Sequence, residues 1–502
     1  MHKLINLHNQ KGVPMDTIIQ HVNEVSIKAF VELQKEFFKN PKDFASYVYG
    51  ISAELQKIGL MIIRESLEDM DRMYRESGLR REKWVINRKD AKQLVTSLGT
   101  VDFSKTLFRN KSTGELSYLL DDVLGMDPHA RMTEDAEAQM LEEAVQTSYR
   151  RGGDAVNPSD SISKTAVKDK LHNLRIPHTW EKPEEKKAVE YLYIEADEDH
   201  ISLQYREQKG DLVQKNGIKN NTLISKLIYV HEGVAPDAPK SRRYHLVNPH
   251  YFARVCDEKG NNAFWDEVYQ YILDNYDVEQ IKKIYLSADG GSWIKSGMKR
   301  LAGITYVLDE FHLTKYLIRL TSHMKDSTDD ARSELYRAIR KGTKAEFNEI
   351  VDRLKDCLPD ATGEARIEEA RSYFLNNWGA ARNRLLKKDG VIGGSTEGHV
   401  SHILSSRMSS RPMGWSRIGA AKMTELRAYY KNGGDMLELV RYQKKELPKV
   451  AGDEDRILLS ARILSQERKA SKKDGKYFDA IQCSVSLDTA KKVWFNGHIW
   501  GL

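Results

Sequence analysis

The chain has 502 residues, of which 40% are hydrophobic and 30% are charged. This length suffices for two to four domains with their own cores, and the composition is that of a folded globular protein and excludes a disordered one. The formal net charge of +6 and the pI near 8.8 permit a nucleic-acid partner without requiring one.

Only three cysteines occur, at positions 256, 357 and 483, with no CxxC or Cys/His spacing. A disulfide framework and a structural zinc ribbon are therefore not expected, and a reducing cytoplasm fits best. No stretch of eighteen consecutive apolar residues predicts a membrane span. The N-terminal segment lacks the apolar core of a secretion signal. We expect a cytoplasmic, nucleoid-associated protein.

Residues 1–80 are expected to form an N-terminal helical region. Between residues 15 and 78, apolar side chains recur at three- and four-residue spacing, which predicts two or three amphipathic helices. A bundle packed on the rest of the chain is favoured over a coiled-coil dimer, because the heptads do not persist.

Residues 81–176 are expected to form a small β-region followed by a helix-turn-helix-like DNA-binding region. Alternation over 83–125, broken by Gly99, suggests a β-meander, and helices return at 133–150. The helix predicted at 159–174 begins with a capping serine, Ser161 or Ser163. Its lysine face, Lys164, Lys168 and Lys170, is that of either a recognition helix or a solvated surface helix, and the pattern alone favours the second.

The pattern changes after a linker-like stretch at 177–187. Strands are predicted at 188–207, 222–233 and 242–252, then a helix at 263–276, a strand ending at Asp289, a helix from Trp293, and a strand entering a helix at 304–317. This β-β-β-α-β-α-β order predicts a three-stranded meander joined to parallel strands. A helical segment (318–390), a glycine turn with a further helix (391–430) and a basic C-terminal region without an interpretable site (431–502) follow.

Asp289 stands at the end of a hydrophobic strand, in "KKIYLSADGGSWIKSG". Strand-end aspartates also occur in nucleotide-binding folds, and "YVLDE" (306–310) imitates that pattern. However, the chain contains no GxxxxGK[ST] loop, and no GxGxxG follows a strand. A nucleotide-binding fold is therefore set aside.

The strand order instead predicts a ribonuclease-H-like mixed five-stranded sheet, an α/β fold. In that fold one acid lies on the first strand, a second ends the neighbouring fourth strand, and a third comes from a later helix. Asp197, Asp289 and Glu397 occupy these places, Glu397 in a helix capped by Ser395 or Thr396. Three carboxylates can hold two Mg²⁺ or Mn²⁺ ions for in-line phosphodiester displacement. Gly290 and Gly291 would leave room for a phosphate backbone.

Four segments strengthen this interpretation: "YIEADEDHISLQ", "LSADGGSWIKSG", "VLDEFHLTKYL" and "GGSTEGHVSHILSSRMSSRPMGWSRIGA". They resemble successive motifs of the bacterial insertion-sequence DDE transposases of the Lre-two type, an uncharacterised protein family distantly related to Mutator-like transposases. The resemblance spans roughly residues 80–430. It implies a ribonuclease-H-like core with a helical insertion before the glutamate helix, an N-terminal DNA-binding region, and a catalytic and metal-binding triad of Asp197, Asp289 and Glu397.

Several neighbouring residues remain open. Asp199 and Glu195 share a strand face with Asp197, and we favour Asp197 because it falls where the family motif has its aspartate. In the family interpretation, Asp309 and His312 shape the site or touch the DNA backbone, and His312 is a candidate DNA-binding residue; the alternative is a helix N-cap aspartate and a core-facing histidine. Trp293 is expected to pack rather than to stack on a base. Further candidate phosphate-binding residues are Lys295, His399, His402, Arg407, Arg411 and Arg417.

The expected activity is metal-dependent DNA cleavage at element ends followed by strand transfer into target DNA. Expected partners are double-stranded DNA (terminal inverted repeats and target) and, from the family resemblance, further copies of the chain in a homodimer or larger assembly. A non-catalytic DNA-binding protein derived from a transposase and a structure-specific nuclease of the same fold are the alternatives. The three acids argue against the first.

Overall fold

A computed structural model of the chain describes residues 25–444, except 77–80, 82, 128, 157–161, 205–220, 299, 301–302, 360, 388–389, 394–395 and 412; five side chains, among them that of Glu397, are also outside the description. The described residues form two compact units, one of residues 25–173 with 435–444 and one of residues 174–434. Within the described part, no helix is both long and apolar enough to span a membrane.

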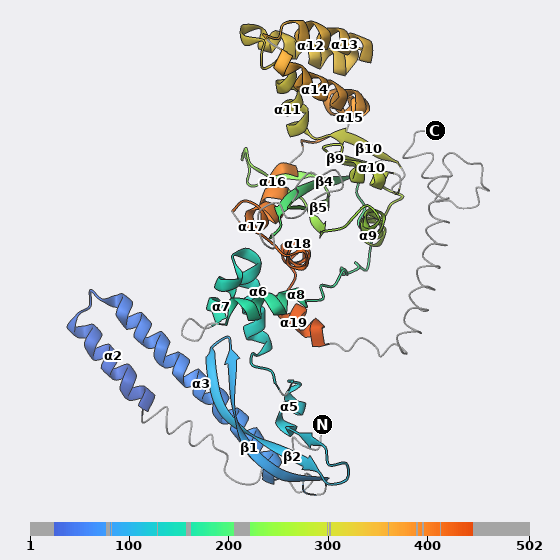
Figure 1. Ribbon diagram of the computed structural model, residues 1–502. Coiled ribbons are helices and arrows are strands. Elements are labelled where there is room, and N and C mark those ends of the chain that lie inside the picture. Colours follow the sequence, from blue (N-terminus) through green and yellow to red (C-terminus); the bar gives the residue numbers. More distant parts are fainter. Residues whose placement is uncertain are drawn as a thin grey trace. The chain divides into compact units, whose positions relative to one another are not determined.

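The first unit combines helices with a β-hairpin (Figure 1). Its elements are α2 (Ile27–Lys39), α3 (Phe44–Glu76), β1 (Trp84–Thr96), β2 (Gly99–Asn110), β3 (Leu116–Ser117), α5 (Leu119–Leu124), α6 (Glu134–Gln146), α7 (Tyr149–Val156), α8 (Lys164–His172) and α19 (Met436–Lys444). The expected β-meander is confirmed as the antiparallel sheet β1-β2-β3, which turns at Gly99 with φ of 142°. Such a φ favours glycine because a side chain would clash there.

The predicted helix at 159–174 is confirmed as α8. The Ser163 hydroxyl caps it by accepting the backbone N–H of Ala166 at 3.2 Å. Val167 and Leu171 are fully buried, as the apolar stripe requires. Helices α6, α7 and α8 pack on one another.

The second unit is built on a five-stranded mixed sheet (Figure 1). Its strands are β4 (Tyr191–Ser202), β5 (Thr222–His231), β8 (His250–Arg254), β9 (Lys283–Ala288) and β10 (Ile304–Leu308), in the order β10-β9-β4-β5-β8. Strands β4, β5 and β8 form an antiparallel meander, and β9 and β10 join β4 in parallel. The predicted meander and parallel strands are confirmed.

The prediction of one strand at 242–252 is wrong. Its first part is β7 (Tyr244–Leu246), which pairs outside the main sheet with β6 (Val234–Pro236). The third strand of the sheet is β8, and Asn248, with φ of 48°, lies in the turn between β7 and β8. A non-glycine residue in the left-handed region marks such a turn.

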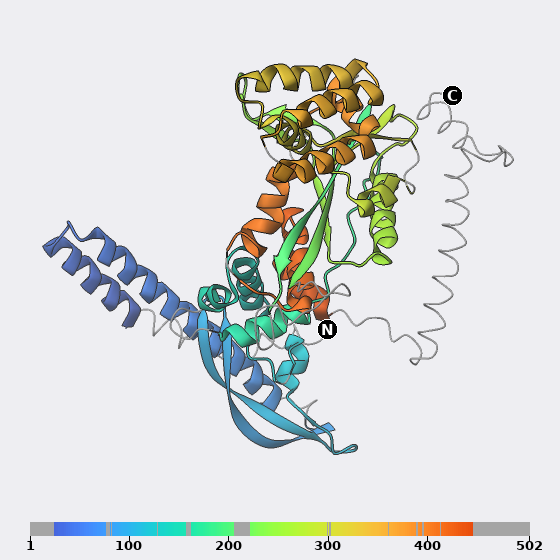
Figure 2. The same cartoon turned by 45° about the horizontal axis from the view of Figure 1, so that its top comes forward.

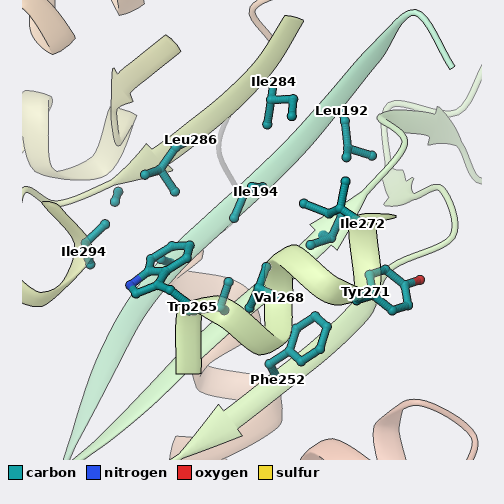
Figure 3. Close-up of a cluster of buried hydrophobic side chains, with 14 of the residues drawn as sticks. Leu192, Ile194, Phe252, Trp265, Val268, Tyr271, Ile272, Ile284, Leu286 and Ile294 are labelled. Carbon is teal, nitrogen blue, oxygen red and sulfur yellow. The ribbon is translucent and has the colours of Figure 1, made fainter. Parts of the chain in front are cut away.

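One face of this sheet forms the main hydrophobic core (Figure 3). Leu192, Ile194 and Ala196 of β4 alternate toward this face. They meet α9 (Gly260–Asn275), whose Trp265 is fully buried, and α10 (Ser292–Met298). The apolar residues of β4 and α9 thereby fix how the parallel strands are packed.

The stretch at 177–187 is mostly exposed, but Trp180 attaches it to the sheet domain. Trp180 lies against Tyr271 in an edge-on contact at 5.4 Å, and its indole N–H donates to Asp274 at 3.2 Å. With β8, α9 and α18 (Arg417–Lys431), this segment lines a cavity of about 550 Å³. The composition of the stretch indicates a linker, but its tryptophan attaches it to the sheet domain.

The helices predicted over 318–390 are confirmed as a bundle whose hydrophobic core includes Leu308 of β10 (Figure 2). They are α11 (Glu310–Thr321), α12 (Thr328–Lys341), α13 (Lys344–Asp356), α14 (Glu364–Asn376) and α15 (Trp378–Leu386), with two short 3₁₀ turns, η3 (Lys325–Ser327) and η4 (Ala361–Gly363). The chain then returns to the sheet through α16 (Thr396–Val400), a π-helical turn η5 (Ser401–Ser405), α17 (Ser406–Met408) and α18 (Arg417–Lys431).

Candidate active site

The second face of the sheet combines acids, which lie in register, with a small apolar cluster of Tyr193, Tyr285 and Val307. In β4, Glu195, Asp197 and Asp199 alternate with the core residues and therefore point to the opposite face. Ala196 pairs with Ala288, and Ala288 pairs with Leu308, so that the next residue on each strand is an aspartate. Asp197, Asp289 and Asp309 thus form one row across β4, β9 and β10.

The row continues the sheet beyond its last regular pair. The backbone N–H of Asp309 donates to the carbonyl of Ala288 at 2.9 Å, as in a parallel ladder. Neighbouring strands lie about 4.8 Å apart, so the backbones of adjacent members of the row are separated by about that distance. The negative charges of Asp289, Asp309 and Asp197 all act on His312. The predicted meeting of Asp197 and Asp289 at one edge agrees with this geometry.

Asp289 is held from two sides. One of its carboxylate oxygens accepts the backbone N–H of Gly291 at 2.8 Å, and its backbone carbonyl accepts the hydroxyl of Tyr373 at 2.6 Å. Gly290 has φ of 100°, and a Cβ there would come within 2.7 Å of the Asn377 side chain. The glycine is therefore required by the backbone and by the close approach of the helical insertion, independently of any phosphate.

Asp309, which is buried, and His312, which is partly buried, form a pair at the start of α11. The Asp309 carboxylate caps the helix by accepting the backbone N–H of His312 at 3.1 Å, and the imidazole lies 3.3 Å from the same oxygen. Burial raises the pKa of Asp309, but the hydrogen bonds and charge of His312 outweigh it and the net shift is downward. Burial lowers the pKa of His312, whereas Asp309 and the neighbouring aspartates raise it, and the net shift is upward. The pair is both a helix cap and a neighbour of the carboxylate row.

The other two acids of β4 have partners of their own. Glu195 accepts the hydroxyl of Tyr229 at 2.8 Å and lies 3.3 Å from the His231 imidazole, all three being buried. Asp199 accepts the Ser409 hydroxyl at 2.9 and 2.8 Å. For Asp197, a carboxylate oxygen accepts the backbone N–H of Glu198 at 2.8 Å. Glu195 is thus engaged by side chains within the fold, and Asp199 is tied to the segment that follows the glutamate helix.

The helix that carries Glu397 lies on this same face of the sheet. Glu397 is the second residue of α16, and α16 packs against β4 (Figure 1). His399 of α16 lies against the Tyr229 ring in a tilted contact at 4.9 Å and shares a hydrogen bond with the Tyr251 hydroxyl at 3.1 Å. Burial lowers the pKa of His399, and the charge of Glu195 opposes this shift. The glutamate helix therefore lies near Glu195 of β4, which precedes Asp197 by two residues.

Arg384 was not anticipated from the sequence, yet it links the parts of this face. This buried guanidinium of α15 donates to the Leu308 carbonyl at 2.8 Å, to the Ser287 hydroxyl at 3.0 Å and to the Ile392 carbonyl. Tyr193 donates to the Gly390 carbonyl at 2.6 Å. Together they fasten the strands β9 and β10 and the segment leading to α16. An isolated arginine in an amphipathic helix gives no sequence signal for this role.

The remaining candidates for DNA contact differ in exposure. Lys164, Arg411 and Arg417 are exposed, and Arg417 begins α18 behind the Ser416 cap. Lys168 is paired with Asp169 at 2.9 Å, and Lys295 is half-buried on α10. Arg407 is buried, with its guanidinium 4.8 Å from the Trp415 ring. Trp293 packs in the core, as expected, and donates to Glu198 at 2.7 Å.

The donor set of the row suits a hard divalent cation. Mg²⁺ and Mn²⁺ take mainly oxygen ligands, and Asp197 and Asp289 offer carboxylates on adjacent strands. Among the side chains that the structure describes, no three His, Cys, Asp or Glu residues are positioned to hold a metal ion. The Glu397 side chain is outside that description.

Comparison with known proteins shows the family. The model of UPF0236, an uncharacterised protein family, matches residues 38–446, and the chain belongs to this family. Two UPF0236 proteins of Caldanaerobacter subterraneus are each 34% identical, over 452 and 438 residues (89% and 87% of this chain, 87% and 88% of theirs). A UPF0236 protein of Streptococcus gallolyticus is 23% identical over 410 residues, covering 78% of this chain and 84% of its own length.

A further relative and a solved structure are also similar to this chain. The name of another Caldanaerobacter relative, 34% identical over 438 residues, joins eleven locus designations. Among solved structures, the Drosophila P element transposase strand transfer complex is similar at 12% identity, with 76% of this chain and 94% of that chain covered and a TM-score of 0.23. A likeness at this score does not establish a shared fold.

Proposed function

We propose that this protein is a DDE transposase that cuts DNA at the ends of an insertion sequence and joins the cut ends to target DNA. The observation that carries the proposal is the register of the sheet: Asp197 and Asp289 follow paired residues on adjacent parallel strands, and the helix of Glu397 packs on the same strand as Asp197. The strand order β10-β9-β4-β5-β8, with two antiparallel and two parallel strand pairs, supports the proposed ribonuclease-H-like fold.

The chemistry follows from the donor set. Asp197, Asp289 and Glu397 would hold two Mg²⁺ or Mn²⁺ ions, which stabilise the attacking and leaving oxygens of a phosphodiester displacement. Tyr373 and Gly291 hold Asp289 in place, and Arg384 fixes the segment that leads to Glu397. Such pre-positioning matters because a misplaced ligand loses most of its effect.

The relatives add an argument of a different kind. Eleven locus designations joined in one name indicate one protein encoded at many places in a genome. A protein that moves its own gene leaves such copies, whereas a nuclease with a fixed cellular role does not require them.

The test is Asp289→Asn with DNA that carries the sequences flanking the gene. We expect the variant to fold and to bind this DNA but to lose strand cleavage with Mg²⁺ or Mn²⁺, because the amide is a poor metal ligand. Asp329→Asn is the matched control, since the Asp329 side chain is 94% exposed on α12. Cleavage by Asp289→Asn at the wild-type rate would reject the proposal.

A further inference from the structure

The α2–α3 hairpin leaves much of its apolar surface uncovered. Helix α2 contains no buried residue, although Phe30, Leu33 and Phe37 lie toward α3. Leu33 approaches Gly50, and Phe37 stacks on Tyr47 at 4.7 Å. One apolar row of α2 therefore packs on α3, and α3 packs on β2 further along.

A second apolar row on each helix remains open. Seven large side chains, each between 41% and 66% exposed, make up the two rows: Ile27, Val31 and Phe38 on α2, and Phe44, Val48, Leu55 and Ile62 on α3. Their spacings of four and seven residues keep each row on one side of its helix. Part of each row follows the seven-residue spacing of antiparallel helix bundles.

Both rows lie on the same side of the hairpin. Successive residues advance about 100° around the helix axis. Measured about that axis, the open row lies roughly 120° from the packed row on α2 and roughly 80° from the packed row on α3. The rotation from packed row to open row has the same sense on both helices. Because the two helices run antiparallel, equal rotational senses bring the rows to one face. Ring contacts of Phe37 with Phe38 at 6.0 Å and with Phe44 at 5.7 Å join the rows at the turn.

The charges beside this face favour an identical partner. Lys35 pairs with Glu32 at 2.6 Å, Lys39 with Glu36 at 2.5 Å, and Lys57 with Glu54 at 2.5 Å. Each pair is neutral within its own helix, so a second hairpin meets no net repulsion and a highly charged partner gains little.

The size of the face also fits. Seven large apolar side chains about half exposed present roughly 600 Å² per copy, and two copies together would bury roughly 1,200 Å², the lower limit of a standard specific interface. Exposed apolar patches of this size mark interaction sites.

We propose that the face made by these seven residues binds the same face of a second chain, forming a four-helix bundle about a two-fold axis. The interface is self-complementary and requires neither DNA nor metal. The proposal is therefore independent of the proposed catalytic function.

The experiment is light scattering of the full-length chain after gel filtration, without DNA. The wild type should have twice the chain mass of 57.6 kDa. Phe38→Glu with Leu55→Glu should reduce the mass to one chain, while the far-UV circular dichroism stays unchanged because both side chains are exposed in the single chain. Val48→Ser with Leu55→Ser is a milder pair that should weaken the dimer at least tenfold.

Leu116→Glu on β3 is the matched control, since Leu116 is equally exposed but outside the hairpin face. It should remain dimeric. A wild type with the mass of one chain would overturn the proposal. The same mass is expected if the first 24 residues cover the face of their own chain, and that result would overturn the proposal too. A folded Phe38→Glu, Leu55→Glu variant that stays dimeric would overturn it equally.

Discussion

The two faces of the main sheet are made by the same strands but differ in their side chains: one face is apolar and buried in the core, and the other carries the acids. On β4, Leu192, Ile194 and Ala196 enter the hydrophobic core, and the residues between them carry acids or tyrosines. Burying a carboxylate costs free energy unless it is hydrogen-bonded or bound to a cation. The comparison teaches that burial of the apolar face stabilises the sheet. This stabilisation offsets the cost of keeping three aspartates in one row on the other face.

The largest difference between the faces should appear when one residue on each is changed. Ile194→Ala should lower the free energy of unfolding by about 2–5 kcal/mol, because it leaves a cavity in the core. Asp197→Asn should leave it unchanged or raise it, because it removes a buried negative charge from an acidic row. Denaturant unfolding measures both.

Ile224→Ala is the control for Ile194, since Ile224 lies in the same sheet but is 37% exposed. Its cost should be small. If Asp197→Asn were as destabilising as Ile194→Ala, the two faces would not differ in the way described.

A smaller effect should separate Asp199 from Asp197. Ser409→Ala removes the hydroxyl that donates to both oxygens of Asp199, and it should cost about 1.5–3 kcal/mol in denaturant unfolding. Mn²⁺ affinity, measured by calorimetry, should stay unchanged in both Ser409→Ala and Asp199→Asn. If Asp199→Asn lost Mn²⁺ binding and Asp197→Asn retained it, Asp199 rather than Asp197 would be the metal ligand on β4.

The smallest expected effect is a pH dependence from His312. Its pKa is raised in the folded state, so its stabilising contribution is present below about pH 6.5 and is lost as the pH rises through the raised pKa. His312→Gln should therefore be less stable than the wild type at pH 6, by less than about 1 kcal/mol, and should approach it at pH 9.

Denaturant unfolding at several pH values measures this difference, and an NMR titration of the imidazole measures the pKa itself. A divalent cation on the neighbouring aspartates should move the His312 pKa downward, since it neutralises the charges that raise it. A pKa indifferent to Mg²⁺ would speak against a cation beside this row.

The sequence predicts the parts of the molecule that depend on local pattern. Strand β4 through Asp197, the strand before Asp289, the capped helix at Ser163 and the helical insertion follow from periodicity and capping residues. The parallel pairing of β4 with β9 follows from the order of elements along the chain.

The rest depends on contacts between residues distant in sequence. Arg384 acts through carbonyls of Leu308 and Ile392, and Ser409 reaches Asp199 over 210 positions. The split of the expected strand at 242–252 depends on β6, which captures its first part. The spacing of apolar residues along the sequence does not indicate which distant residues will be in contact.

The most direct test of the central claim is the position of a metal ion. A crystal of the chain with its DNA and Mn²⁺ should show anomalous density between the carboxylates of Asp197 and Asp289, with the Glu397 carboxylate as a further ligand. Manganese bound elsewhere, or a Glu397 side chain directed away from β4 in that complex, would contradict it.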